Sequence, residues 1–200
     1  MRNMRIILFD IDGTLFDSKK FMNLVRVELA SHLGVNENDV YKGVEDYYSY
    51  LSSNTDFNPH KLLEHLSGFF KTDEESLKSI FWDDKHYKEA LYPETIKVLK
   101  NLQKKMDLGI FSQGFEDFQM HKLIASGILQ YFNKKLYYIS RKKLDNAFIK
   151  TLPNEAVVVD DRIEAVDKLG KMAIWINRNN EDEANFKGEM IKDLNQLMLI

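Results

Sequence analysis

Four aspartates stand at two points of the chain where their carboxylates could act together. Asp10 and Asp12 belong to the string Asp-Ile-Asp-Gly-Thr-Leu, which follows an apolar run, and Asp160 and Asp161 follow a second apolar run. Like charges gathered in one place repel one another, so such a group persists only where a cation or a proton neutralises it. Because oxygen ligands alone select a hard cation, the cation we expect is Mg²⁺.

Each pair also has an explanation without chemistry. Asp and Gly are common turn residues, so Asp10 to Gly13 could be a turn, although the six-residue string is rare by chance. Asp161 could cap a helix that begins near Ile163. The position of Asp160 and Asp161 after a predicted strand favours a functional role for this pair, because ligands of an open parallel sheet bind beyond the carboxyl ends of its strands.

Two further segments carry groups that could bind phosphate. Ser112 and Gln113 precede a glycine at the start of a predicted helix, where a hydroxyl and free backbone N–H groups can bind a phosphate oxygen. The alternative is that Ser112 only caps that helix. Lys142 and Lys143 follow another predicted strand, and either ammonium could offset the charge of a phosphate among carboxylates, although a solvated loop also explains them.

The secondary-structure elements predicted around these residues indicate an α/β fold. Five short apolar runs rich in Ile and Val are typical of buried parallel strands. We expect these strands at residues 5–11, 107–112, 135–140, 156–160 and 172–177. Helical patterns separate the later strands, at 93–104, 115–126, 144–152 and 163–169, and a last amphipathic helix is expected at 188–199. Alternating strands and helices predict a doubly wound parallel sheet.

Residues 17–88 have a different pattern, with helical periodicity only. Helices are expected at 19–33, at 37–51, after Asn58-Pro59, and from Thr72, where Thr72 and Glu75 have the spacing of a capping box. We therefore predict a helical bundle inserted after the first strand, with hinges near 16–18 and 88–92. The predicted division is a core of residues 1–16 and 89–200 and an inserted cap of residues 17–88.

The chain resembles the haloacid dehalogenase-like hydrolase superfamily in the order of its motifs. These are the Asp-x-Asp-Gly-Thr-Leu string, the strand-end Ser, the Lys and the Asp-Asp pair. The resemblance covers the whole chain and implies a Rossmann-like core, a helical cap between the first two motifs, and phosphoryl transfer through an aspartyl-phosphate. It implies that Asp10 is the nucleophile and Asp12 the general acid and base. It also implies that Ser112 and Lys143 hold the phosphoryl oxygens.

The resemblance further implies a Mg²⁺ site. Asp10, Asp161 and the backbone carbonyl of Asp12 would coordinate the ion, with Asp160 as a ligand or as a neighbour of the ligands. Two features depart from the family pattern. Pro usually follows the Lys of the family, whereas Leu144 follows Lys143 here, so the choice between Lys142 and Lys143 stays open with Lys143 preferred. No later aspartate takes the common third acidic position, and Asp167 is expected at the surface.

The residue types narrow the reaction. A carboxylate can attack phosphorus only where a cation and a lysine reduce the repulsion between the two anions. The resemblance also bears on carbon–halogen cleavage: members of the family that cleave such bonds lack the second Asp, since a halide leaves without a proton, so the presence of Asp12 disfavours dehalogenation. The expected function is a Mg²⁺-dependent phosphatase for a small phosphorylated metabolite. The alternatives are a sugar-phosphate phosphomutase and a non-catalytic regulatory or binding protein.

Composition is consistent with an enzyme of this kind and excludes other classes. The 200 residues are 44% hydrophobic, with 28 Lys and Arg against 31 Asp and Glu, which argues against general nucleic-acid or membrane-surface binding. The chain has no cysteine, so disulfides, thiolate metal sites and a Cys nucleophile are excluded. A cytoplasmic location is expected, and the oligomeric state cannot be read from the sequence. The five histidines and Arg178 are expected to be structural or surface residues.

The second predicted cap helix carries a group of tyrosines, Tyr47, Tyr48 and Tyr50. They are expected to form the cap core with one exposed ring. The alternative is that they contact the leaving group of the substrate.

Overall fold

A computed structural model describes residues 6–180 and 186–199. Its centre is a six-stranded sheet of order β3-β2-β1-β4-β5-β6, in which every neighbouring pair is parallel. The strands are β1 (Ile6–Phe9), β2 (Asp107–Gln113), β3 (Tyr137–Ser140), β4 (Ala156–Asp160), β5 (Ala173–Ile176) and β6 (Glu189–Ile191). This order is that of a Rossmann-like doubly wound sheet, so the predicted fold class is confirmed.

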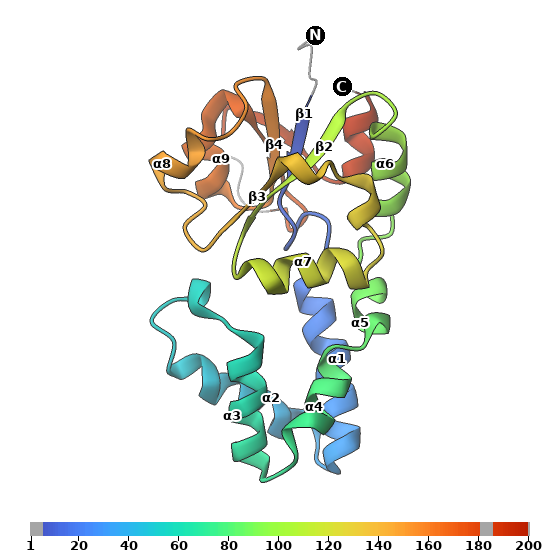
Figure 1. The fold of residues 1–200 in the computed structure, drawn as a ribbon, viewed down its shortest axis with the longest axis vertical. Helices are drawn as coiled ribbons and strands as arrows, with labels where there is room; N and C mark the ends of the chain where they lie inside the picture. Colours follow the sequence, from blue (N-terminus) through green and yellow to red (C-terminus); the bar gives the residue numbers. More distant parts are fainter. Residues whose placement is uncertain (1–5, 181–185, 200) are drawn as a thin grey trace.

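Helices cover both faces of the sheet, which explains why the strands read as continuous apolar runs. Ile7 and Phe9 of β1 face one core, together with α6 (Thr95–Leu102), α7 (Glu116–Ala125) and the 3₁₀ helix η5 (Leu194–Leu199). Leu8 faces the other core, with α8 (Asn146–Ile149) and α9 (Ile163–Leu169). In Figure 1, α6 and α9 lie on opposite sides of the sheet. Helix α7 lies at the end of the sheet that faces the helices of residues 18–89.

The segment between β1 and α6 holds the 3₁₀ helix η1 (Asn54–Asp56) and five α-helices. The α-helices are α1 (Ser18–Leu33), α2 (Glu37–Ser49), α3 (Pro59–Phe70), α4 (Glu74–Phe81) and α5 (Asp84–Glu89). We call α1–α4 the helical bundle, which lies beyond the carboxyl end of the sheet in Figure 1. Its helices pack through buried apolar residues, and Tyr47 belongs to that core.

The two connections between bundle and sheet run side by side. The backbone N–H of Asp17 donates to the carbonyl of Ala90 at 2.8 Å, and the N–H of Tyr92 donates to the carbonyl of Leu15 at 3.2 Å. The hydroxyl of Thr95 also donates to the Leu15 carbonyl, at 3.0 Å. Asp17, Ala90 and Tyr92 lie in the two segments where hinges are predicted, and Leu15 and Thr95 lie just outside them. The boundaries at 16/17 and 88/89 stay a prediction.

Three predicted elements were wrong in type or in bounds. The segment 188–199 is not one amphipathic helix, because Glu189–Ile191 forms the edge strand β6 beside β5 and a 3₁₀ helix follows. The fourth bundle helix begins at Glu74, because the side chain of Asp73, and not that of Thr72, accepts the backbone N–H of Ser76. The helix expected at 144–152 is only Asn146–Ile149.

Within residues 6–180 and 186–199, no helix combines the length and apolarity needed to cross a membrane.

Candidate active site

The segment after β1 is folded tightly around two aspartates. The backbone N–H of Asp10 donates to the carbonyl of Val159 at 2.9 Å, which places Asp10 beside the end of β4. Gly13 then turns the chain with a φ of 77°, in the left-handed region that favours glycine. The side chain of Arg178 donates to the carbonyl of Thr14 at 2.8 Å and pairs with Glu94 at 2.7 Å, so its role in the described structure is to hold this loop.

Three carboxylates converge beside this loop. Ligand atoms of Asp10, Asp160 and Asp161 all lie within 4.8 Å of one another, whereas Asp12, which was predicted to converge with them, is not part of this group. Gly13 is needed for this arrangement, because a Cβ at that position would lie 2.1 Å from Oδ2 of Asp161. Asp161 does not cap α9, whose N-cap residue is Arg162. Its Oδ1 is buried and lacks a hydrogen-bond partner among the described residues.

One buried lysine faces this group. The Nζ of Lys143 lies 2.7 Å from Oδ1 of Asp10 and 2.7 Å from Oδ2 of Asp160, and its side chain is 1% exposed. The neighbouring Lys142 is exposed at the surface. The structure therefore places Lys143, rather than Lys142, against the carboxylates.

The electrostatics of the group favour a bound cation. Burial, together with the charges of Asp160 and Asp12, raises the pKa of Asp10 to about 6 although Lys143 opposes the shift. Burial and the charges of Asp10 and Asp160 raise the pKa of Asp161 to about 8. Burial disfavours the Lys143 ammonium, but Asp10 and Asp160 outweigh this effect and raise its pKa. One lysine thus leaves the group short of positive charge, and the unpartnered oxygen of Asp161 suits a hard divalent ion.

The strand-end serine points toward no protein partner. Ser112 is 1% exposed, and its Oγ has no hydrogen-bond partner among the described residues. It does not cap α7, whose N-cap residue is Phe115. A buried hydroxyl without a partner is costly unless a ligand uses it, so this geometry favours phosphate binding over capping.

The Gln113 side chain is already engaged. Its Nε2 donates to the carbonyl of Arg141 at 3.0 Å, and its Oε1 accepts from Arg162 at 2.8 Å. Its backbone carbonyl also accepts, from Nε2 of Gln119 at 3.0 Å, so a phosphate contact by this residue would have to use its backbone N–H.

Asp12 belongs to a separate network that sequence reasoning missed. The Nζ of Lys122, on α7, lies 2.6 Å from Oδ1 and 2.7 Å from Oδ2 of Asp12. The side chains of Gln119 and Ser18 also donate to this carboxylate. Burial disfavours ionisation of Asp12, but Lys122 outweighs burial and holds the pKa of the carboxyl below its usual range.

A signal for Lys122 was present in the sequence. Phe118, Lys122 and Ala125 have the spacing of one helical stripe, and all three are buried. A lysine within an apolar stripe indicates a buried ionic partner, because Lys is almost never fully buried unless it is paired.

A cavity of about 430 Å³ opens beside Asp12, between α7 and the helical bundle. Its polar end is formed by Asp12, Ser18, Gln119 and Lys122, and its wall includes the rings of Tyr48, Phe57 and Phe118. Of the three tyrosines, Tyr47 is buried with its hydroxyl on the backbone of Asn58, and Tyr50 is exposed. Tyr48 is the one that faces the cavity.

The described histidines lie outside the carboxylate group. His86 is buried beside Glu28 at 3.0 Å, and His121 packs edge-on against Trp82 and Tyr87. Asp167 is exposed at the surface, as expected.

The chain belongs to the haloacid dehalogenase-like hydrolase family, whose model matches residues 4–167. It is 30% identical over 140 residues to a glyceraldehyde 3-phosphate phosphatase of Methanothermobacter thermautotrophicus, and the match covers 66% of this chain and 61% of that protein.

Two solved structures share the fold. A HAD phosphatase of Thermococcus onnurineus has a TM-score of 0.64 at 24% identity, with 98% of this chain and 97% of that chain covered. A protein of Burkholderia xenovorans LB400, described as a haloacid dehalogenase-like hydrolase, has a TM-score of 0.72 at 19% identity, with 98% and 95% covered.

Proposed function

We propose that the chain is a Mg²⁺-dependent phosphatase that hydrolyses a small-molecule phosphomonoester through an aspartyl-phosphate on Asp10. The observation that carries this proposal is the pairing of two carboxylates with two different buried lysines. Asp10 contacts Lys143 inside the acidic group, whereas Asp12, two residues later, contacts Lys122 outside it. Two aspartates in such different surroundings suit two different tasks.

Asp10 is the residue we assign as nucleophile. An oxygen of its carboxylate attacks phosphorus, the bond between phosphorus and the ester oxygen breaks, and the phosphoryl group passes to Asp10. Lys143, 2.7 Å from this carboxylate, and the unpartnered hydroxyl of Ser112 would hold the phosphoryl oxygens. Both groups are buried, so they are in place before the substrate arrives.

Asp12 is the residue we assign to proton transfer. In the first step it gives a proton to the leaving ester oxygen, and in the second it takes one from the water that attacks the aspartyl-phosphate. Lys122 favours the carboxylate form, which the second step needs. A phosphate dianion beside Asp12 opposes its negative charge, and this repulsion favours the protonated form that the first step needs.

The residues present fit a Mg²⁺ ion. Asp10, Asp161 and the backbone carbonyl of Asp12 would hold it, while both oxygens of Asp160 already accept, from Lys143 and from the backbone N–H of Arg162. When bound, the ion supplies positive charge that offsets the repulsion between the nucleophile and the phosphate. We further propose that the helical bundle acts as the cap of the site and that its position excludes water from the reacting groups.

The test is phosphate release from a panel of sugar phosphates, nucleotides, phosphoglycolate and alkyl or aryl phosphates. We expect release that needs Mg²⁺, stops with a chelator, and is lost in Asp10→Asn. The matched control is Asp167→Asn, an exposed aspartate on α9, which should keep full activity. Release that survives Asp10→Asn or the chelator would refute the mechanism.

The same panel separates the two alternatives. Turnover of a sugar phosphate only after priming with its bisphosphate would indicate a phosphomutase. Mg²⁺ binding without release from any substrate would favour a non-catalytic role.

A further inference from the structure

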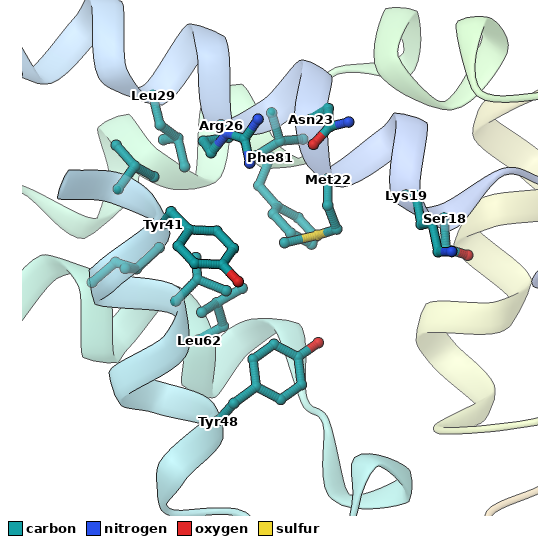
Figure 2. Close-up of a pocket in the computed structure, with 14 residues that line it drawn as sticks. Ser18, Lys19, Met22, Asn23, Arg26, Leu29, Tyr41, Tyr48, Leu62 and Phe81 are labelled. Carbon is teal, nitrogen blue, oxygen red and sulfur yellow. The ribbon is translucent and has the colours of Figure 1, made fainter. Parts of the chain in front are cut away.

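A second cavity lies within the helical bundle. It has a volume of about 790 Å³ and follows α1 from Ser18 to Leu29, with α2 opposite. We call it the bundle groove. In Figure 2, Arg26 and Asn23 lie along its α1 side, Tyr41 and Tyr48 lie along its α2 side, and Met22 and Phe81 lie between them. The stretch of α1 that it follows is about 16 Å long, at the helical rise of about 1.5 Å per residue.

The bundle groove meets the cavity beside Asp12. Ser18, Met22 and Tyr48 line both spaces. Ser18 also donates a hydrogen bond to the Asp12 carboxylate, so the groove begins where the proton for the leaving group is held. The two spaces therefore adjoin, and the groove leads away from Asp12 into the bundle.

The lining of the groove is apolar along its floor and polar at its edge. The floor includes Val25, Val40 and Leu62, each at most 1% exposed. Along the edge, Nε of Arg26 is buried without a hydrogen-bond partner among the described residues, while its terminal nitrogen lies 3.4 Å from Glu37. An apolar floor with a few polar groups is typical of small-molecule sites.

The rings on the α2 side are not covered by the fold. Tyr41 is 48% exposed and Tyr48 is 38% exposed, although both are large and mostly apolar. Together with the half-buried Met22, they leave an uncovered apolar surface next to the reacting groups.

We propose that the bundle groove binds the alcohol portion of the substrate, and that this portion is elongated and mainly apolar, an alkyl or alkyl-aryl chain. The proposal rests on the proposed phosphatase function and names its substrate class. A three-carbon sugar phosphate has no chain with which to fill a groove of about 790 Å³. The preference should therefore differ from that of a triose-phosphate phosphatase.

The first test compares ethyl, butyl, hexyl and octyl phosphate below the concentrations at which they form micelles. Each buried methylene contributes up to about a fourfold gain in affinity, and the groove is partly open, so we expect kcat/KM to rise at least about tenfold from ethyl to octyl phosphate. The glyceraldehyde 3-phosphate value should resemble that of the short esters. A flat series would overturn the proposal and leave the phosphatase function intact.

The second test blocks the groove. Val44, on α2, is half-buried and lines the groove but not the cavity beside Asp12, so Val44→Trp should fill it. We expect octyl phosphate to lose most of its advantage, at least about fivefold, while ethyl phosphate is turned over at the wild-type rate. The matched control is Val27→Trp, at an exposed position on α1 outside the groove, which should leave the whole series unchanged. Equal effects of the two variants would contradict the assignment.

A binding measurement separates failure of this proposal from failure of the proposed function. Calorimetry with ethyl and octyl phosphonate, which cannot be hydrolysed at the carbon–phosphorus bond, needs no turnover. Tighter binding of octyl phosphonate to wild type, lost in Val44→Trp, supports the groove even if no ester is hydrolysed. Equal affinities for the two phosphonates would refute the groove as a chain site and would favour a protein segment as its occupant.

Discussion

Lys122 on α7 and Asp12 after β1 form a two-point ion pair, with Nζ 2.6 Å and 2.7 Å from the two carboxylate oxygens. The lysine side chain is 5% exposed and the aspartate side chain 33%. The pair fixes both oxygens of Asp12 at the entrance of the cavity while the residue stays reachable by substrate. Orientation of the proton-transfer group therefore depends on a residue that lies 110 positions later in the chain.

We expect Lys122→Met to damage both stability and turnover. The change leaves the half-buried Asp12 carboxylate without its cation, which should cost about 2 kcal/mol of unfolding free energy. It should also lower kcat by about tenfold or more, because Asp12 loses its fixed orientation. Urea unfolding and steady-state kinetics measure the two effects. Lys122→Arg keeps the charge and should recover part of the turnover. Equal kcat values for the Lys122→Met and Lys122→Arg variants would argue against an ionic role of Lys122.

Ser112→Ala should separate function from stability. The Oγ of Ser112 is buried and has no protein partner, so its removal should not lower the unfolding free energy of the ligand-free protein and should raise it slightly. We expect kcat/KM to fall by about tenfold through a lost phosphoryl contact. Ser126→Ala is the matched control, because the Ser126 hydroxyl, at the C-cap of α7, donates to the carbonyl of Lys122. That variant should lose about 1 kcal/mol and keep its turnover; the reverse pattern would mean that Ser112 is structural.

Gly13→Ala should disrupt the metal site. The new Cβ would lie 2.1 Å from Oδ2 of Asp161, in addition to the strain of an alanine at a φ of 77°. Gly34 provides the control, since it has a φ of 65° at the end of α1 with no atom within 4 Å of an added Cβ. Both variants should lose about 1 kcal/mol from backbone strain. Only Gly13→Ala should weaken Mg²⁺ binding, by at least about tenfold in titration calorimetry, and equal Mg²⁺ affinities would show that the close approach is unimportant.

Stability of the metal-free protein should fall as pH rises. The pKa values of Asp10 and Asp161 are raised from 3.8 to about 6 and about 8, so above pH 4 these two carboxyls bind more protons in the folded protein than in the unfolded chain. Burial lowers the pKa of His121 from 6.5, and this smaller opposing effect ends as the pH passes 6.5. Each unit of pH therefore costs stability until the pH passes about 8. Thermal melts from pH 5 to pH 9 measure this decline in chelator.

Adding Mg²⁺ should raise the melting temperature, and the gain should be larger at pH 8 than at pH 5, because the bound carboxylates must be ionised. A metal-free melting temperature that rises between pH 5 and pH 8, or a gain independent of pH, would contradict the carboxylate site.

The parts of the fold that depend on local patterns were predictable from the sequence. Apolar runs such as 156–160 identify strands buried on both faces, and Gly34 and Pro59 mark helix ends where the structure has them. The last segment was not predictable in this way. Met190, Leu194 and Leu197 have helical spacing, but pairing with β5 makes Glu189–Ile191 an edge strand. Tertiary pairing outweighs local periodicity over so few residues.

Part of the candidate site was likewise predictable from the sequence, and part of it was not. Strand ends that meet at one edge of a parallel sheet predicted a group of four aspartates, and three of them, Asp10, Asp160 and Asp161, do lie together. The choice between Lys142 and Lys143 could not be made from the sequence. The side chains of two adjacent loop residues point in different directions, and their positions in the sequence do not tell which one points toward the carboxylates. Ser18 joins the Asp12 network from the helical bundle, and its contact depends on how the bundle sits against the sheet.

The central claim is that Asp10 carries the phosphoryl group during turnover. The direct measurement uses Asp12→Asn with p-nitrophenyl phosphate, whose leaving group departs without a proton donor, so the first step proceeds while the second lacks its base. After acid quench and borohydride reduction, peptide mapping should find homoserine at position 10 and at no other aspartate, with a burst of nitrophenol of about one per protein. Turnover without modification of Asp10, or a phosphoryl group on another residue, would contradict the assignment.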